Sequence, residues 1–509
     1  MKKILIPFSL IYFPLTISIG LIWLQNDGFG SLLSFALWQL IMAKIVYDLV
    51  WLSTAWLSPV EHIPKLAELR HYPSVGLLYV CRDDVVVECL QELAHQNYPN
   101  FDVFILDDSQ IARNIALVDQ IAGQIEPVLK NQGKVKVVRR ANLSGYKAGN
   151  LNNWLKQYGD QYDYFVIFDN DSKADPNFIG DMVSYAEHPK NRQIALFQSK
   201  IFPWNGHENY FVRFIGATAP LYMYLLDKLG NRTGTVISFG HNNLHRTKPV
   251  IEIGGFNVDL TSEDTAITLE LDANQYQTAV VDVLSYEAEP SNLAKYRRRA
   301  IRWAGQTAAL FHYPWEKTSG ALKFEISRQL IYYLINLIFF VWLLSSIWYV
   351  ANKSSLSDLY HQVVALIKFY ETPYILTFGL VSALLFLHLI IHILLARRSG
   401  VRLRYYAGHI VTSMAVYFYA IVPVSIAFLK ALFGQRVVFK PSNLSFANSS
   451  FREVIAPMAI LWAIGSIAIA QYFWFGENPW EYLGGWWAMV IWITPFLLYL
   501  VQHYPSRSH

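Results

Sequence analysis

Cysteine and charge are both scarce in this chain. Cys81 and Cys89 are the only cysteines among 509 residues, so the sequence holds no disulfide framework and suits a reducing cytoplasm. Charged residues make up 16% of the chain, against 53% hydrophobic and 15% aromatic residues, which is too apolar for one soluble globule. The polar middle of the chain also lacks a glycine-rich dinucleotide fingerprint and a P-loop motif.

What the sequence has instead is long apolar stretches at both ends. Each is about the ~20 residues needed to cross a bilayer. They are Ile4–Leu24, Leu32–Leu52, Gln329–Val350, Tyr374–Leu395, Tyr406–Leu429, Val454–Phe473 and Tyr482–Val501. The first has no clear small-residue cleavage site, so we interpret it as a retained helix and not as a signal peptide.

Basic residues flank these stretches, and such residues normally stay on the cytoplasmic side. They are Lys2, Lys3, Arg397, Arg398, Arg402, Arg404, Lys430, Arg436, Lys440, Arg452 and Arg507. All of them remain inside if six stretches cross and Tyr406–Leu429 lies at the interface; the alternative is seven spans. We therefore expect a multi-pass protein of a bacterial inner membrane, with its catalytic domain in the cytoplasm.

This layout divides the chain into three parts. Residues 1–58 hold two transmembrane helices. Residues 59–324 have ordinary charge density and are long enough for one water-soluble domain. Residues 325–509 hold about four spans, the interfacial helix near 406–429 and a candidate gating loop near 435–443, for which a plain basic loop is an equal alternative.

The middle domain alternates predicted strands with predicted helices, which indicates an α/β fold with a doubly wound sheet. The expected strands are Val75–Cys81, Phe101–Leu106, Val135–Val138 and Tyr164–Phe168, and the expected helices include Val85–His95 and Lys147–Gln157. In such sheets a ligand lies beyond the carboxyl ends of the strands. Asp107, Asp108, Asp169 and Asp171 follow two of these strand ends and are expected to converge on one crevice.

The sequence Asp169-Asn170-Asp171 is the strongest single signal in the domain. Two carboxylates one residue apart at a strand end can hold Mg²⁺ or Mn²⁺ against a diphosphate. Asp107-Asp108 could accept hydrogen bonds from a nucleobase or ribose. For both pairs a turn or a helix cap is the alternative.

Three further groups of polar residues complete the candidate site. Lys147 opens a helix together with Ala148-Gly149-Asn150, an arrangement suited to a diphosphate. The sequence Ser262-Glu263-Asp264 precedes a helical run, where the helix dipole favours an ionised Asp264 that could act as a general base; Ser262 or Thr261 as a simple helix cap is the alternative.

Arg299, Arg302 and Trp303 share one helical face about thirty residues later. The guanidinium groups could hold phosphate charge and the indole could stack on a sugar ring. A basic helix resting on lipid headgroups is the alternative. His241 and His245 are four residues apart, but no third ligand lies nearby in the sequence, so we do not expect a metal site there.

These motifs, in this order, resemble those of membrane-embedded family 2 glycosyltransferases, and the pattern is nearest to the processive cellulose, chitin and hyaluronan synthases. The resemblance covers Val75 to Trp303 by motif and the rest by layout. It implies a GT-A-like doubly wound glycosyltransferase domain inserted in an α-helical transmembrane bundle.

The resemblance also implies a role for each motif. Donor binding would fall to Asp107, Asp108, Lys147, Asp169, Asp171, Arg299 and Arg302. Asp169 and Asp171 would hold the metal, Asp264 would deprotonate the acceptor hydroxyl, and Trp303 with Glu263 would bind the acceptor. The family usually has Gln at the position of Arg299. An arginine there occurs in enzymes resembling ceramide glucosyltransferases, which act once on a lipid, so Arg299 puts processivity in doubt.

The expected activity is therefore inverting, metal-dependent transfer from a nucleotide diphosphate sugar, expected to be a UDP-sugar, that elongates a β-linked polysaccharide and exports it. Transfer of one sugar to a membrane lipid is the first alternative, and a transporter or scaffold with a degenerate transferase domain is the second. The expected partners are the donor, a growing glycan or lipid acceptor, membrane lipids, and accessory export or regulatory subunits, but no nucleic acid.

Overall fold

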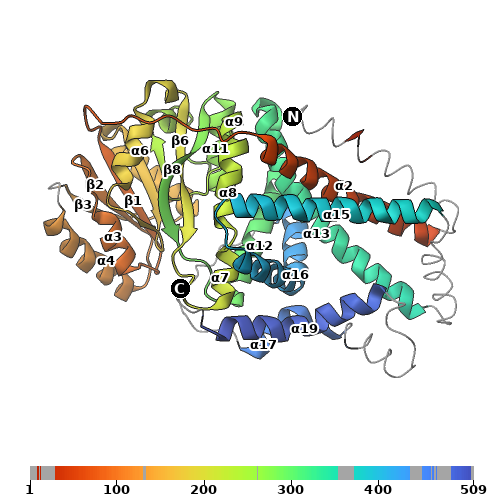
Figure 1. Ribbon diagram of the computed structural model, residues 1–509. Coiled ribbons are helices and arrows are strands. Elements are labelled where there is room, and N and C mark those ends of the chain that lie inside the picture. The colour runs from red at the N-terminus through yellow and green to blue at the C-terminus, as the bar shows by residue number, and fades with distance from the viewer. Residues whose placement is uncertain are drawn as a thin grey trace.

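The computed structural model describes residues 9–10, 12, 29–129, 133–260, 262–352, 372–435, 450–459, 461–463, 466 and 483–505. These residues form a sheet-containing domain and a group of long helices that extend away from it (Figure 1). Most of the expected span Ile4–Leu24, nearly all of the gating loop near 435–443 and half of Val454–Phe473 fall outside the described residues.

The sheet of the domain has eight strands in the order β3-β2-β1-β4-β7-β6-β8-β5. Their bounds are β1 Val75–Cys81, β2 Phe101–Asp107, β3 Val135–Val138, β4 Tyr164–Asp169, β5 Lys173–Ala174, β6 Ile194–Pro203, β7 Asn243–Arg246 and β8 Gln277–Glu287. The four strands predicted from sequence are confirmed within a residue at each end. The four later strands were not predicted.

The first half of the sheet is parallel. Strand β1 pairs with β2 on one side and β4 on the other, so that Cys81 lies opposite Asp107 and Val80 opposite Asp169. The carboxyl ends of these strands therefore meet at one edge, as a doubly wound sheet requires. The second half is mixed, because β7 runs antiparallel to β4 and β6, and β5 runs antiparallel to β8.

Helices cover both faces of this sheet, which explains why its central strands are almost continuously apolar. The bounds are α3 Val87–Ala94, α4 Ala112–Ile125, α5 Tyr146–Tyr158, α6 Phe178–Ala186, α7 Tyr210–Gly216, α8 Ala219–Leu225, α9 Asn231–Thr233, α10 Thr247–Glu252, α11 Glu263–Ala273 and α12 Leu293–Ala309. Helices α3, α4 and α6 pack on the face that carries Leu77. Helices α5, α10 and α11 pack on the other, around Phe104 and Trp154.

The long helices begin and end as follows: α2 Phe29–Leu57, α13 Gly320–Asn352, α15 Thr372–Arg398, α16 Leu403–Leu432 and α19 Leu483–His503, with the short α17 Phe451–Ile455 beside α19. Helix α16 packs against α12 of the sheet domain and against α13 and α19. It thereby ties the two regions together through a shared apolar cluster that includes Phe211 and Phe428.

Within the described residues, α16 is the one helix whose length and composition would let it cross a membrane, and a little over half of its apolar window is buried in protein. Helix α16 contains Tyr406–Leu429, the segment that the sequence analysis expects at the membrane interface because of its basic flanking residues. The expected transmembrane bundle and the three-part layout stay predictions.

Candidate functional site

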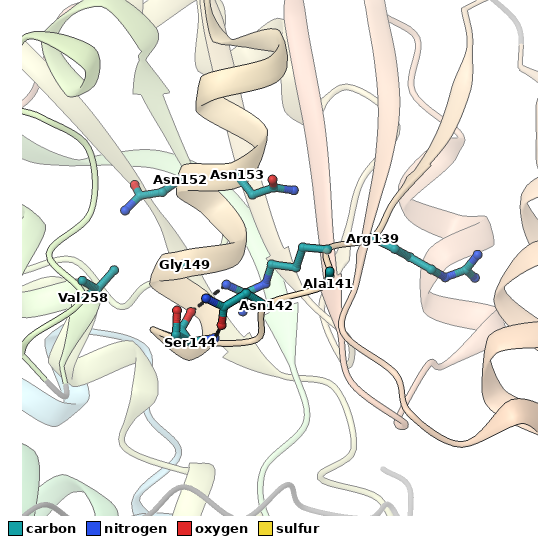
Figure 2. Close-up of a pocket in the computed structure, with 9 residues that line it drawn as sticks. Arg139, Ala141, Asn142, Ser144, Gly149, Asn152, Asn153 and Val258 are labelled. Atoms are coloured by element: carbon teal, nitrogen blue, oxygen red, sulfur yellow. Dashed lines mark hydrogen bonds between the residues drawn. The ribbon is translucent and has the colours of Figure 1, made fainter.

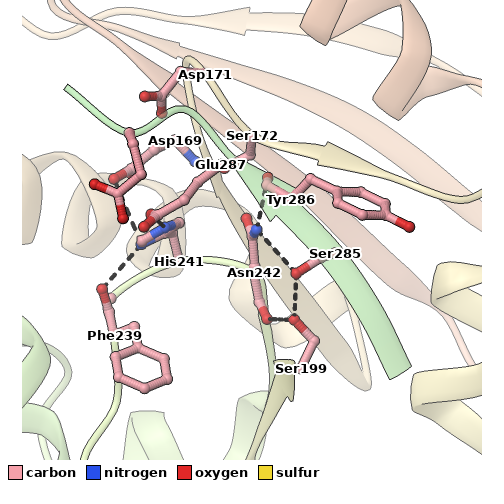
Figure 3. Close-up of polar contacts among 12 residues, drawn as sticks. Asp169, Asp171, Ser172, Ser199, Phe239, His241, Asn242, Ser285, Tyr286 and Glu287 are labelled. Carbon is pink, nitrogen blue, oxygen red and sulfur yellow. Dashed lines mark hydrogen bonds and ion pairs between the residues drawn. The ribbon is translucent and has the colours of Figure 1, made fainter. Parts of the chain in front are cut away.

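A cluster of charged residues surrounds the carboxyl end of β4 (Figure 3). Lys147, at the start of α5, donates a hydrogen bond to one carboxylate oxygen of Asp169. His241, from the loop before β7, lies on the other side of Asp169, with 3.7 Å between Nδ1 and Oδ2. Burial acts to raise the pKa of Asp169, but the Lys147 and His241 charges outweigh it and hold that pKa below its ordinary value.

Both ring nitrogens of His241 face hydrogen-bond acceptors. Nδ1 lies 2.9 Å from the carbonyl oxygen of Phe239, and Nε2 lies 2.6 Å from a carboxylate oxygen of Glu287, at the end of β8. Each nitrogen must then carry a proton, which makes the ring an imidazolium. Burial acts to lower its pKa, yet Asp169 and Glu287 raise it to about 9.

The loop that presents His241 has an unusual backbone. Gly240 has a φ of +83° and Asn242, a buried non-glycine residue, has a φ of +53°. Asn242 is held there because its amide donates hydrogen bonds to Ser285 Oγ and to the carbonyl oxygen of Tyr286, at 3.0 and 3.2 Å. A non-glycine residue in the left-handed region is usually retained for a local reason, here the placement of the neighbouring imidazolium.

His245 does not share this site. It is fully buried, stacks on Phe165 with ring centroids 4.8 Å apart, and bonds through Nε2 to Asn243. Burial lowers its pKa to about 3, which keeps it neutral. His245 therefore lies in the core of the domain, apart from the charged cluster around His241.

Asp171 completes the acidic group at the end of β4. Burial, followed by the nearby Glu287 and Asp169 charges, raises its pKa to about 7. Two carboxylates one residue apart at a strand end are hard oxygen donors, so Asp169 and Asp171 fit Mg²⁺ or Mn²⁺. Among the described residues, no group of three or more acidic, histidine or cysteine side chains is placed to hold a metal ion.

The position of Lys147 follows from the glycines around it. Gly145 and Tyr146, with φ values of +72° and +47°, turn the chain sharply into α5. At Gly149 a Cβ atom would lie 2.2 Å from the carbonyl oxygen of Ser144, so a larger residue would push the turn away. The predicted helix start at Lys147 is confirmed within one residue.

The general-base candidate Asp264 lies in the first turn of α11. Ser262 occupies the N-cap position, but its hydroxyl donates to a carboxylate oxygen of Asp264 instead of capping a backbone N–H. The backbone N–H of Thr265 donates to the same oxygen at 2.7 Å. The simple helix-cap alternative for Ser262 is therefore wrong. Glu263 is beside it, and burial and the Asp264 charge raise the pKa of Glu263.

Lys147 links this turn to the β4 acids. Burial acts to lower its pKa, but Asp169, Glu263 and Asp264 together keep that pKa above the ordinary lysine value. Contacts connect the same motifs: Lys147 bonds to Asp169, and the loop that carries His241 and Gly240 lies against both Asp169 and Asp264, although more than a hundred residues separate Lys147 from Asp264 in the sequence.

The basic motif on α12 is brought to the same site. Arg299 forms an ion pair with Glu289, both largely buried, and its guanidinium lies 4.8 Å from the centroid of the Trp303 ring. Arg302 is close enough to Asp169 to lower the pKa of that carboxyl. Trp303 is 46% exposed, so a ligand can reach its indole ring.

Asp107 and Asp108 differ from the other acids of the predicted set. Arg139 donates to Asp107 through Nε at 2.7 Å, and Arg140 binds both oxygens of Asp108 at 2.9 and 2.6 Å. Arginines that directly follow β3 neutralise these two acids, and the sequence alone did not predict those ion pairs. Their predicted contact with the nucleoside is untested.

A cavity of about 530 Å³ adjoins this pair of arginines (Figure 2). It is lined by Arg139, Arg140, Ala141, Asn142, Ser144, Gly149, Asn152, Asn153 and Val258. None of the β4 acids contributes to it, so it lies beside the cluster around Asp169 and not within it.

Sequence reasoning missed four charged residues of this site: His241 as a partner of Asp169, and Glu287, Glu289 and Asp84. Burial and Asp169 raise the pKa of Asp84 to about 6. Each of these residues lies in or next to a strand that the sequence analysis either did not predict or did not connect to the acidic pair. An isolated acid at the end of an unassigned strand gives no periodic signal.

Comparison with known proteins places the chain in a family. Residues 164–503 match the model described as glycosyl transferase family group 2, which is well over half of the chain. The glucomannan 4-beta-mannosyltransferase 1 of Cyamopsis tetragonoloba is 26% identical over 47% of this chain and 45% of its own length. The beta-monoglucosyldiacylglycerol synthase of a Synechocystis strain is 27% identical over 50% of this chain and 55% of its own.

A third relative, the probable glucomannan 4-beta-mannosyltransferase 7 of Oryza sativa subsp. japonica, is 29% identical over 35% of this chain and 30% of its own length. The chain thus spans about a third to a half of these curated relatives. Among solved structures, a mannosyltransferase from Pyrobaculum calidifontis in complex with GDP-Man and Mn²⁺ has a TM-score of 0.49 and 16% identity, over 71% of this chain and 98% of that one.

The match extends over the β4 acids, the Asp264 turn, α12 and the long helices that follow α12, but not over α2. The sequence-based prediction of a family 2 glycosyltransferase is therefore confirmed, and its mannosyl- and glucosyltransferase relatives support the predicted class of hexosyltransferase. The chain belongs to glycosyl transferase family group 2.

Proposed function

We propose that this protein is an inverting hexosyltransferase that takes a sugar from a nucleotide diphosphate sugar and adds it to a growing β-linked polysaccharide at a membrane. The observation that carries the proposal is that Lys147 and His241 both contact Asp169, while Gly240, next to His241, packs against Asp264. The site thus brings together Lys147, Asp169 and Asp264. Those are the three chemical functions that such a transfer needs: a cation for the diphosphate, a metal-binding acid, and a base.

The donor diphosphate would lie against the positive groups at the end of β4. Lys147, Arg302 and the His241 imidazolium all surround Asp169. Asp169 and Asp171 would hold Mg²⁺ or Mn²⁺ there, and the bound ion would offset the charge that develops on the leaving diphosphate. The Nε atom of Arg299 is buried and makes no hydrogen bond within the described part of the chain, which leaves a donor for a phosphate or acceptor oxygen.

Asp264 would take the proton from the acceptor hydroxyl. Hydrogen bonds from Ser262 and from the Thr265 backbone fix one of its oxygens, which leaves the other for the acceptor. A base held on the face of the sugar opposite the diphosphate gives inversion, because the acceptor attacks as the leaving group departs. Glu263 and Trp303 would line the acceptor side, and Asp107 or Asp108 would lie near the nucleoside, expected to be uridine.

Polymer synthesis is supported by the exposed face of Trp303, which can stack on a terminal sugar, and by the glucomannan mannosyltransferase relatives. Export would need membrane spans from both ends of the chain and a cytoplasmic position for the sheet domain. The basic residues that flank the apolar stretches favour this layout. The second candidate is transfer of one sugar to a membrane lipid. It is favoured by Arg299 in place of the usual Gln and by the glucosyldiacylglycerol synthase relative.

Product size separates these two candidates. Full-length protein in membranes would be incubated with single radiolabelled nucleotide sugars, and the products sized before and after digestion with a β-specific glycosidase. We expect chains whose length falls in Trp303→Ala while donor hydrolysis persists. The matched control is Phe311→Ala, because Phe311 is also aromatic and 46% exposed but lies beyond the motif. A monoglycosylated lipid as the only product would replace polymer synthesis with the second candidate.

A further inference from the structure

The turn between α15 and α16 carries an unusual density of positive charge. Residues 397–404 contain four arginines and no acidic residue. Arg397, Arg398, Arg402 and Arg404 are all exposed. No ion pair joins Arg397, Arg398 or Arg404 to a carboxylate of the described residues, whereas Arg139, Arg140 and Arg299 of the sheet domain are each paired with an acid.

A tightly packed turn holds these arginines in place. The backbone N–H of Val401 donates to the carbonyl oxygen of Ala396 at 3.0 Å and closes the turn around Gly400, whose φ is +87°. Val401 and Tyr406 are buried against Leu52 of α2 and Leu221 of α8. The charged side chains therefore stand on a packed apolar cluster and not on a free loop.

Two guanidinium groups from different parts of the chain converge on one residue of this turn. Arg213 of α7 donates to the Tyr405 hydroxyl at 3.1 Å, and Arg404 donates to the same oxygen at 2.9 Å. Both guanidinium groups also lie over the Tyr405 ring, 5.2 and 4.7 Å from its centroid. Several guanidinium groups around one small polar centre are the usual arrangement for binding a phosphate group.

The surface next to these arginines is apolar. Leu403, Ile410, Val411 and Met414 of α16 are 39–49% exposed and recur at helical spacing on one side of the helix. At 1.5 Å per residue, Val411 and Met414 lie about 10–15 Å beyond Arg404 along the axis. A phosphate at the arginines would thus place an attached acyl chain along this apolar strip.

We propose that Arg213, Arg402, Arg404 and Tyr405 bind the phosphate of an anionic phospholipid whose acyl chain lies along Leu403, Ile410, Val411 and Met414. Charge selects the anionic headgroup, and the apolar strip selects a lipid over a soluble phosphate. Because Arg213 belongs to the sheet domain and α16 to the long helices, the bound lipid would join the two regions where they meet (Figure 1). This site does not depend on which sugar is transferred.

Binding to defined lipids tests the site directly. Detergent-purified full-length protein would be titrated with phosphatidylglycerol and, separately, with phosphatidylcholine, and the bound lipid counted by native mass spectrometry. We expect preference for phosphatidylglycerol, and a loss of its affinity of about tenfold or more in Arg213→Gln/Arg402→Gln/Arg404→Gln, since each basic residue at a membrane surface contributes appreciably. The matched control, Arg113→Gln/Arg192→Gln/Lys248→Gln, removes three exposed charges from the sheet domain and should bind as wild type does.

Two further measurements keep the outcome decisive. A phosphatidylglycerol with a photoreactive acyl chain should label wild-type α16 between residues 403 and 414, which needs no variant to fold. Inorganic phosphate should not displace the lipid. Equal affinity for the two lipids, unchanged affinity in the triple variant, labelling elsewhere only, or displacement by inorganic phosphate would each overturn the proposal.

Discussion

Gly240 and Asp264 are in direct contact: a Cβ atom added to Gly240 would lie 3.1 Å from the Cβ of Asp264. Gly240 also has a φ of +83°, a conformation that side chains other than hydrogen disfavour. The loop that delivers His241 to Asp169 therefore also positions the proposed base, and one glycine connects the two halves of the site.

Gly240→Ala should accordingly impair catalysis more than stability. Alanine at this φ costs on the order of 1–3 kcal/mol, and the new methyl group would push on the Asp264 side chain. We expect kcat for sugar transfer to fall about tenfold or more, since small displacements of a base are costly. Gly123→Ala in α4 is the control, because nothing lies within 4 Å of its added Cβ. Equal kcat in both variants would mean that Gly240 does not position the Asp264 side chain.

Asp171 should make metal binding depend on pH. Its pKa is raised to about 7 by burial and by Glu287 and Asp169, so it is protonated below pH 7 and ionised above it. A metal ligand must lose its proton, so the affinity for Mn²⁺ with a nucleoside diphosphate should fall as pH drops below 7, by about tenfold per unit. Calorimetry in buffers of different ionisation enthalpy would count the released proton.

The control for this titration is Asp171→Asn, which cannot ionise. It should bind the metal complex weakly and with a much smaller pH slope, and removal of metal by a chelator should abolish transfer by the wild type. An equal slope in wild type and variant would assign the proton to another group.

Arg299 and Glu289 should prove energetically coupled. Arg299→Gln restores the residue usual in the family, and from sequence alone it should be tolerated by a polymer-making enzyme. The ion pair changes that expectation, because the substitution leaves the largely buried Glu289 carboxylate unpaired. We expect a loss of about 3 kcal/mol in unfolding free energy, measured by chemical denaturation.

The double variant Arg299→Gln/Glu289→Gln should recover most of that stability, because both charges are then removed. Additive effects of the two substitutions would mean that the pair does not contribute to the fold.

The parallel half of the sheet could be predicted because its strands are buried on both faces and form apolar runs, as in Tyr164–Asp169. The mixed half could not, because β7 is four residues long and three of those residues, Asn243, His245 and Arg246, are polar. The pairing of β7 with β4 depends on contacts between residues about eighty positions apart, which local pattern does not reveal.

The candidate site shows the same division. Asp169, Asp171, Lys147 and Asp264 were found from short motifs, and the structure brings them together. The partners of those residues were not found: His241 and Glu287 are single residues without a motif, and Arg140 was not connected with Asp108 although a bidentate ion pair joins them. Charge compensation between distant loops becomes visible only when the sheet is assembled.

The most direct test of the proposed mechanism is sugar transfer by Asp264→Asn. The amide keeps the shape of the side chain but cannot accept the acceptor proton. In single-turnover assays with saturating donor and acceptor, we predict a rate at least about a hundredfold below wild type, with the dissociation constant for the nucleotide diphosphate sugar nearly unchanged. A transfer rate close to wild type would contradict the account, because it would remove Asp264 as the base.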